Sequence, residues 1–134
     1  MSTTVFALVG FTAWYLLLNV GLAVFRLRLI ASGVKAPNSF ATDGADLPGL
    51  GRRLTRARDN CFETLPVFVA LAFAANASGR LDVTDGLAMW VLFARLGQSV
   101  THILSVSVNA VRLRAALFFA QVTIYIWWAI QLLA

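Results

Sequence analysis

Three side chains with complementary chemistry follow one another at helical spacing. Arg56, Asn60 and Glu63 stand at positions i, i+4 and i+7, and at about 100° per residue they fall within roughly 60° of one another on a helix. A guanidinium binds a carboxylate through two hydrogen bonds, and a carboxylate can bind an amine. The spacing therefore predicts one polar stripe that suits an anionic ligand that also carries an amine.

Further polar stripes occur elsewhere in the chain. The spacing i, i+3, i+4 and i+7 connects a longer set that lies on one face of a second helix: Arg95, Gln98, Ser99, His102, Ser105 and Asn109. Two smaller sets share a face near the two ends of the chain: Tyr15, Asn19 and Arg26, and Gln121, Tyr125 and Trp128. Every predicted helix therefore has a polar side.

The helices that carry these stripes are predicted to cross a membrane. Hydrophobic residues make up 60% of the chain and charged residues 13%, and the mean hydropathy is +0.79. A span of the bilayer needs about 20 mostly apolar residues, and four stretches reach that length. We predict an all-α membrane protein, one domain of residues 1–134 forming a four-helix bundle with helices at about 4–30, 55–78, 85–108 and 112–134 and a loop at 31–54.

The eleven basic residues indicate orientation rather than a nucleic-acid partner. Most of them surround the first and third connections, and by the positive-inside rule this predicts that both connections are cytoplasmic and both termini non-cytoplasmic. The single cysteine, Cys61, excludes an intramolecular disulfide, and no Cys or His pair has the spacing of a metal site. We expect neither a metal nor a nucleic acid.

A charge within the membrane is expensive, which restricts how the polar stripes can be arranged. Arg95 falls near the middle of its span, and Glu63 is the only acidic residue predicted well inside a helix, so an ion pair between them is expected. Hydrogen bonds between helices would account for four other polar residues: Asn19, Ser99, Ser105 and Gln121. The remaining cluster holds more cations than such bonds need, which indicates a ligand site.

The segment from Arg56 to Phe68, with the sequence RARDNCFETLPVF, resembles the signature of the MAPEG family, the membrane-associated proteins in eicosanoid and glutathione metabolism. The pattern is Arg-Ala, then Asn, then Glu three residues on, then Pro. The segment from Phe93 to Leu96 is similar to the family's third helix. The form of the motif looks most like small bacterial members, which implies location in a bacterial inner membrane.

The resemblance implies a homotrimer that binds glutathione as cosubstrate between adjacent subunits. The family's glutathione-contacting residues match Arg56, Asn60, Glu63 and Arg95 here, while Gln98 and His102 stand in place of its ligand-contacting tyrosines, and Arg26 on the first helix completes the candidate set. A further arginine stabilises the thiolate in several members. We take Arg112 as the first choice for it and Arg114 as the second.

The function implied is a glutathione-dependent transferase or peroxidase acting on lipophilic electrophiles or hydroperoxides dissolved in the bilayer. A thiol titrates near pH 8.5, and a neighbouring cation lowers that value, so the nucleophilic thiolate forms at neutral pH. Phe118, Phe119 and Tyr125 mark a candidate region for the lipophilic substrate. Two alternatives stay open: a non-catalytic membrane scaffold, and a small four-helix transporter in which Glu63 meets a cation.

Overall fold

The protein, seen in a computed structural model that describes all 134 residues, consists of four helices and no strand. The helices are α1 (Thr3–Ala31), α2 (Gly49–Ala77), α3 (Asp82–Leu104) and α4 (Val108–Leu133). All four are long and apolar enough to span a membrane. The predicted all-α fold class is therefore confirmed.

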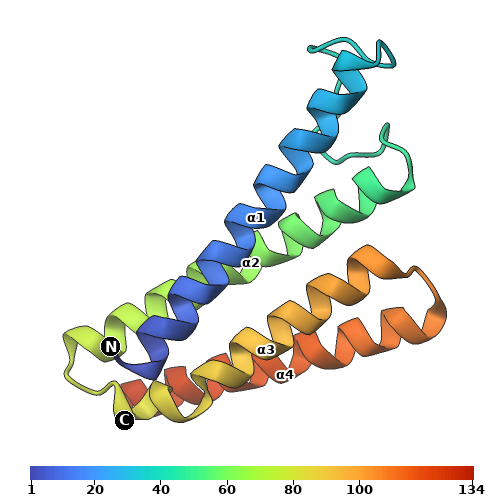
Figure 1. The fold of residues 1–134 in the computed structure, drawn as a ribbon. Helices are drawn as coiled ribbons and strands as arrows, with labels where there is room; N and C mark the ends of the chain where they lie inside the picture. The colour runs from blue at the N-terminus through green and yellow to red at the C-terminus, as the bar shows by residue number, and fades with distance from the viewer.

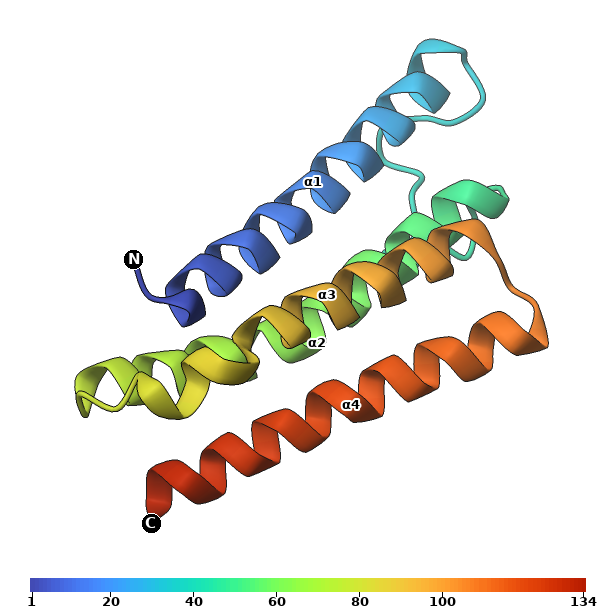
Figure 2. The ribbon, with the colours of Figure 1, turned by 60° about the horizontal axis from the view of Figure 1, so that its bottom comes forward.

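Successive helices run antiparallel and pack against one another (Figure 1). α1, α2 and α3 contact each other, and α4 packs mainly on α3 with a smaller contact on α2. α1 and α4 make no contact, and Figure 2 shows them on opposite sides of the α2–α3 pair. Both termini lie at one end of the bundle, and the segment 32–48 lies at the other, which we call the loop end.

One aromatic side chain of α2 connects the two outer helices. The ring centroid of Phe68 lies 6.0 Å from that of Phe11 on α1, and 6.1 and 5.8 Å from those of Tyr125 and Trp128 on α4. All four side chains are buried. Because the backbones of α1 and α4 lie apart, on opposite sides of the α2–α3 pair, this cluster connects them through the core.

The second helix begins earlier than expected, at Gly49 instead of near residue 55. Pro48 precedes it in an extended conformation (φ −64°, ψ 158°) and cannot donate a backbone hydrogen bond, which is tolerated at a helix start. Gly51 allows α1 to approach, since a Cβ there would lie 2.5 Å from Cε1 of Phe25. Gly51 therefore serves helix packing, and the first helical turns of α2 carry Arg52 and Arg53.

The third helix ends sooner than expected, at Leu104 instead of near residue 108. Ser105 is extended (φ −150°, ψ 149°), and the Ser107 hydroxyl accepts a hydrogen bond from the Ala110 amide at 3.2 Å, which caps the start of α4. The predicted stripe on this helix is therefore too long. It ends at His102, because Ser105 lies in the connection and Asn109 on α4.

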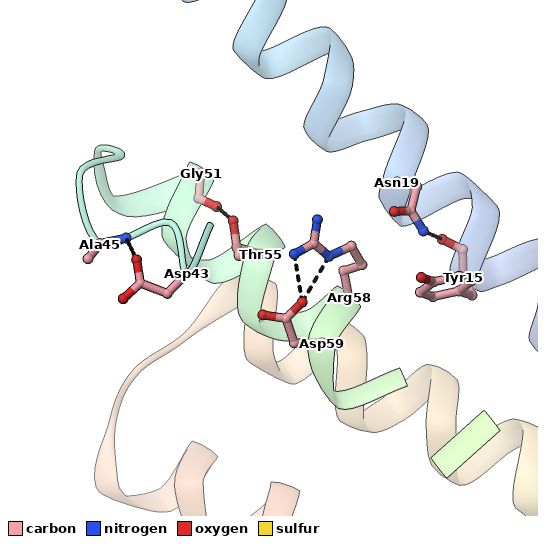
Figure 3. A network of polar contacts seen from close by, with 8 residues as sticks. All are labelled: Tyr15, Asn19, Asp43, Ala45, Gly51, Thr55, Arg58 and Asp59. Carbon is pink, nitrogen blue, oxygen red and sulfur yellow. Dashed lines mark hydrogen bonds and ion pairs between the residues drawn. The ribbon is translucent and has the colours of Figure 1, made fainter. Parts of the chain in front are cut away.

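The loop end is closed by the segment 32–48, which folds back on α1 and α2. Lys35 forms an ion pair with Asp46 at 2.8 Å, and this hydrogen bond holds the pKa of the Asp46 carboxyl below its ordinary value of 3.8. Gly44 adopts a positive φ of 69° against the side chain of Thr55, a conformation that favours glycine. Thr55 itself donates to the Gly51 carbonyl within α2 (Figure 3).

Candidate functional site

The polar stripe predicted on α2 lines a hollow of about 250 Å³ near the loop end. Its lining is entirely polar, and we call it the mixed-charge hollow: Arg56, Asp59, Asn60, Glu63 and His102. Four of these come from successive turns of α2, and His102 comes from the last turn of α3. Folding therefore brings Arg56, Asn60, Glu63 and His102 of the predicted site together.

Hydrogen bonds inside this hollow leave two charged groups without a partner. The Asn60 amide nitrogen lies 3.1 Å from Nδ1 of His102. Because an amide NH₂ group can only donate, Nδ1 accepts this hydrogen bond, and the neutral imidazole carries its proton on Nε2. Asp59 accepts from Nε and Nη2 of Arg58 at 2.9 and 2.7 Å (Figure 3). The guanidinium of Arg56 and the carboxylate of Glu63 form no ion pair within the chain and can bind a ligand.

A second hollow of about 450 Å³ adjoins the first at the loop end. We call it the basic hollow, and it shares two residues with the mixed-charge hollow. It is lined by Gly49, Arg52, Arg53, Arg56, His102, Val106, Val111 and Arg114. Arg53 donates from Nε to the Ile103 carbonyl at 2.6 Å, which ties the start of α2 to the end of α3.

Arg52 and Arg53 are absent from the predicted site because the sequence patterns placed them in a loop. With the helix beginning at Gly49, they precede Arg56 by four and three residues and extend the same stripe by one turn. The signal was present in the spacing. It was missed because the predicted loop, 31–54, included both residues.

Deeper in the bundle, a set of hydrogen bonds that we call the ladder connects the polar faces of α2, α3 and α4. The Cys61 sulfur lies 3.4 Å from the Ser99 hydroxyl, and the Gln121 amide donates to Oε1 of Gln98 at 3.0 Å. This confirms interhelical bonding for Ser99 and Gln121. The expectation is wrong for Asn19, which donates to the Tyr15 carbonyl of its own helix (Figure 3). It is also wrong for Ser105, which lies in the connection and donates to the Ser107 hydroxyl at 3.2 Å.

Arg95 does not form the expected ion pair with Glu63. Its guanidinium is fully buried, donates from Nη2 to Oγ1 of Thr64 at 2.5 Å and lies over the ring of Phe11, 5.3 Å from the centroid. Nε and Nη1 have no hydrogen-bond partner. The reason is helical phase, because α2 turns Thr64 toward α3 and leaves Glu63, one residue away, on the exposed side.

Four candidate residues lie outside both hollows. Arg95 and Gln98 are buried in the ladder. Arg26 on α1 lies over the ring of Phe40, 5.5 Å from its centroid. Arg112 is exposed, whereas Arg114 on the same helix lines the basic hollow.

The mixed-charge hollow can bind a carboxylate at Arg56 and an amine at Glu63, while the basic hollow brings further guanidinium groups next to it. The MAPEG family model matches residues 4–134, nearly the whole chain. The chain belongs to the MAPEG family. No curated protein and no solved structure matches it.

Membership agrees with four helices that can span the bilayer, so this MAPEG protein is an integral, multi-pass membrane protein. The resemblance seen in the segment from Arg56 to Phe68 is thus confirmed at the level of the family. The family is associated with glutathione use, and the residues of this MAPEG chain that carry the signature are those that line the mixed-charge hollow: Arg56, Asn60 and Glu63.

Proposed function

We propose that this protein is a glutathione-dependent membrane transferase or peroxidase that binds glutathione in the mixed-charge hollow. The main support is that the Arg56 guanidinium and the Glu63 carboxylate lie on one face of α2, and neither forms an ion pair within the chain. Glutathione carries two carboxylates and one ammonium group. Arg56 would bind a carboxylate, Glu63 the ammonium, and the Asn60 and His102 side chains, already bonded to each other, would border the peptide.

Arg114 is the residue we propose for stabilising the thiolate. It lines the basic hollow beside Arg56 and His102, whereas Arg112 lines neither hollow. A guanidinium next to the sulfur lowers the pKa of the glutathione thiol and so raises the fraction of thiolate at neutral pH. This choice reverses the order expected from the sequence, because two residues along a helix turn a side chain by about 200°.

The thiolate would then attack a lipophilic substrate dissolved in the bilayer. In a transfer, sulfur forms a bond to an electrophilic carbon, and the leaving group departs with the electrons of the broken bond. With a hydroperoxide, sulfur bonds to the terminal oxygen as the O–O bond breaks, which gives a sulfenic acid and an alkoxide; the alkoxide takes a proton from water and leaves as the alcohol. A second glutathione then reacts with the sulfenic acid to give the disulfide and water. An apolar groove of about 450 Å³ between α2 and α4, bordered by Thr64 and Tyr125, is a candidate entry for such molecules.

The proposal includes a homotrimer in which each glutathione lies between two subunits. α1 and α4 make no contact within the chain, so each leaves apolar surface free for lipid or another subunit. Arg26 lies outside both hollows of its own chain, and a neighbouring subunit would be the one to use it. Native mass spectrometry of the detergent-purified protein should show three chains, and a monomer would contradict this part of the proposal.

Thiolate absorbance in the ultraviolet on mixing with glutathione tests binding and activation together. We expect a signal from the wild-type protein, loss of the signal in Arg114→Ala, and retention in Arg112→Ala, which removes an equal charge from the same helix. Arg56→Ala should raise the glutathione Kd by about 10- to 100-fold, the value of one charged hydrogen bond of roughly 1.5–3 kcal/mol. No binding to the wild-type protein at millimolar glutathione would refute the proposal.

A cation transporter is the second candidate, because Glu63 has no ion pair and is exposed toward the mixed-charge hollow. A proton-coupled carrier needs an accessible carboxylate of this kind. Proton-coupled cation uptake into liposomes that disappears in Glu63→Gln would favour the carrier. Glutathione binding without such uptake would favour the enzyme.

A further inference from the structure

The basic hollow contains two arginines, Arg52 and Arg53, that the proposed glutathione site does not use, beside Arg56 and Arg114, which that site shares. It is lined by four arginines and His102 and by no acidic residue, whereas Asp59 and Glu63 both face the mixed-charge hollow. The side chains of three of these arginines, Arg52, Arg56 and Arg114, form no hydrogen bond or ion pair within the chain. Like charges gathered in this way repel one another, and a bound anion removes that repulsion.

We propose that the basic hollow binds the phosphate group of an anionic membrane phospholipid. Arginine is well suited to phosphate because its planar guanidinium donates two parallel hydrogen bonds to phosphate oxygens. Arg53 is held in place by its bond to the Ile103 carbonyl, so one wall of the site is ordered before a ligand arrives. Arg52 lies on the exposed side of the same turn and has no role in the proposed glutathione site.

The surroundings of the hollow favour a lipid over a free phosphate ion. Val106 and Val111 line it, and three leucines close to its lining residues in the chain are exposed: Leu50 is 44%, Leu104 76% and Leu113 50% accessible. A phosphate bound to the arginines would leave acyl chains free to follow these apolar surfaces into the bilayer. Basic pockets between membrane helices at the cytoplasmic surface are a known mode of anionic lipid recognition.

The position along the membrane normal agrees with this assignment. The hollow is formed where α2 begins, α3 ends and α4 begins, which is the loop end and hence the level of the lipid headgroups. The distribution of basic residues predicts that this end is cytoplasmic, the side on which the leaflet surface is negative. The arginines would then serve both membrane orientation and lipid binding.

Native mass spectrometry of the detergent-purified protein, without glutathione, tests the proposal by titration with phosphatidylglycerol, phosphatidylcholine and inorganic phosphate. We expect phosphatidylglycerol to bind at least tenfold more tightly than phosphatidylcholine. The double variant Arg52→Gln, Arg114→Gln should lower that affinity at least tenfold. The matched double variant Arg28→Gln, Arg112→Gln removes the same charge outside the hollow and should change it less than twofold.

Three results would overturn the proposal: equal affinity for the two lipids, equal losses in the two double variants, or inorganic phosphate binding as tightly as the lipid. The single variant Arg52→Gln keeps the test valid should a double variant fail to fold, since this exposed side chain has no partner; it should then weaken lipid binding at least threefold. Because glutathione is absent from the titration, failure here leaves the proposed enzymatic function untouched, and failure of thiolate formation leaves lipid binding untouched.

Discussion

Replacing Arg95 by methionine is expected to stabilise the folded protein. The guanidinium is fully buried, and it donates a hydrogen bond to the Thr64 hydroxyl from Nη2. That bond contributes about 1.5–3 kcal/mol, and the ring of Phe11 adds at most about 2 kcal/mol. Two terms destabilise the folded state: two guanidinium nitrogens without a hydrogen-bond acceptor, at about 1–3 kcal/mol each, and the desolvation of the charge, at several kcal/mol.

Methionine has a similar length and helix propensity and places no charge in the core. Substituting apolar residues for buried ionic groups often stabilises proteins by about 1–4 kcal/mol, and we expect Arg95→Met to fall in that range. The free energy of unfolding is measured by titrating the protein in mixed micelles with sodium dodecyl sulfate and following helix content.

Thr64→Val supplies the control for this interpretation. In the wild-type background it removes the hydroxyl that accepts from the buried guanidinium and should destabilise the protein by about 1–3 kcal/mol. In the Arg95→Met background Thr64→Val should have almost no effect on stability. The double-mutant cycle should therefore give a coupling energy between Arg95 and Thr64 of about 1–3 kcal/mol.

A loss of 2 kcal/mol or more on Arg95→Met would refute this reasoning. It would mean that the guanidinium has an anionic partner in the assembled protein, as was expected from the sequence for Glu63. A double-mutant cycle of Arg95 with Glu63 would then show coupling, and the cycle of Arg95 with Thr64 would not.

Two further predictions concern packing and pH. Gly51→Ala should destabilise the protein by about 1–3 kcal/mol in the same titration, because its Cβ would overlap an aromatic ring of α1; Gly86→Ala on α3, where no atom lies within 4 Å, should be neutral or stabilising by up to about 1 kcal/mol. Because the folded-state pKa of Asp46 lies below 3.8, its pair with Lys35 stabilises the fold above that pH and is lost as pH falls through the folded value. The thermal midpoint of Asp46→Asn should therefore fall less steeply than that of wild type below pH 4, and identical slopes would contradict this.

Local patterning predicted the elements and their polar faces well. Length and hydropathy indicated four membrane helices, and the 3.6-residue period correctly placed Arg56, Asn60 and Glu63 on one wall of a hollow. These features depend on residues close together in the chain, and each helix satisfies its backbone hydrogen bonds internally in a bilayer. The helix boundaries were less accurate, because the extended Ser105 and the helical Gly51 both depend on their neighbours in space.

Other outcomes could be decided only by the packed structure. Thr64 and not Glu63 meets Arg95, and Arg114 and not Arg112 lines a hollow. In each case the alternatives differ by one or two residues, which corresponds to a rotation of about 100° or 200° around the helix. Composition and period report that a helix has a polar face, but the direction of that face relative to its neighbours is set by contacts between residues far apart in the chain, such as those of Phe68 with Phe11 and Trp128.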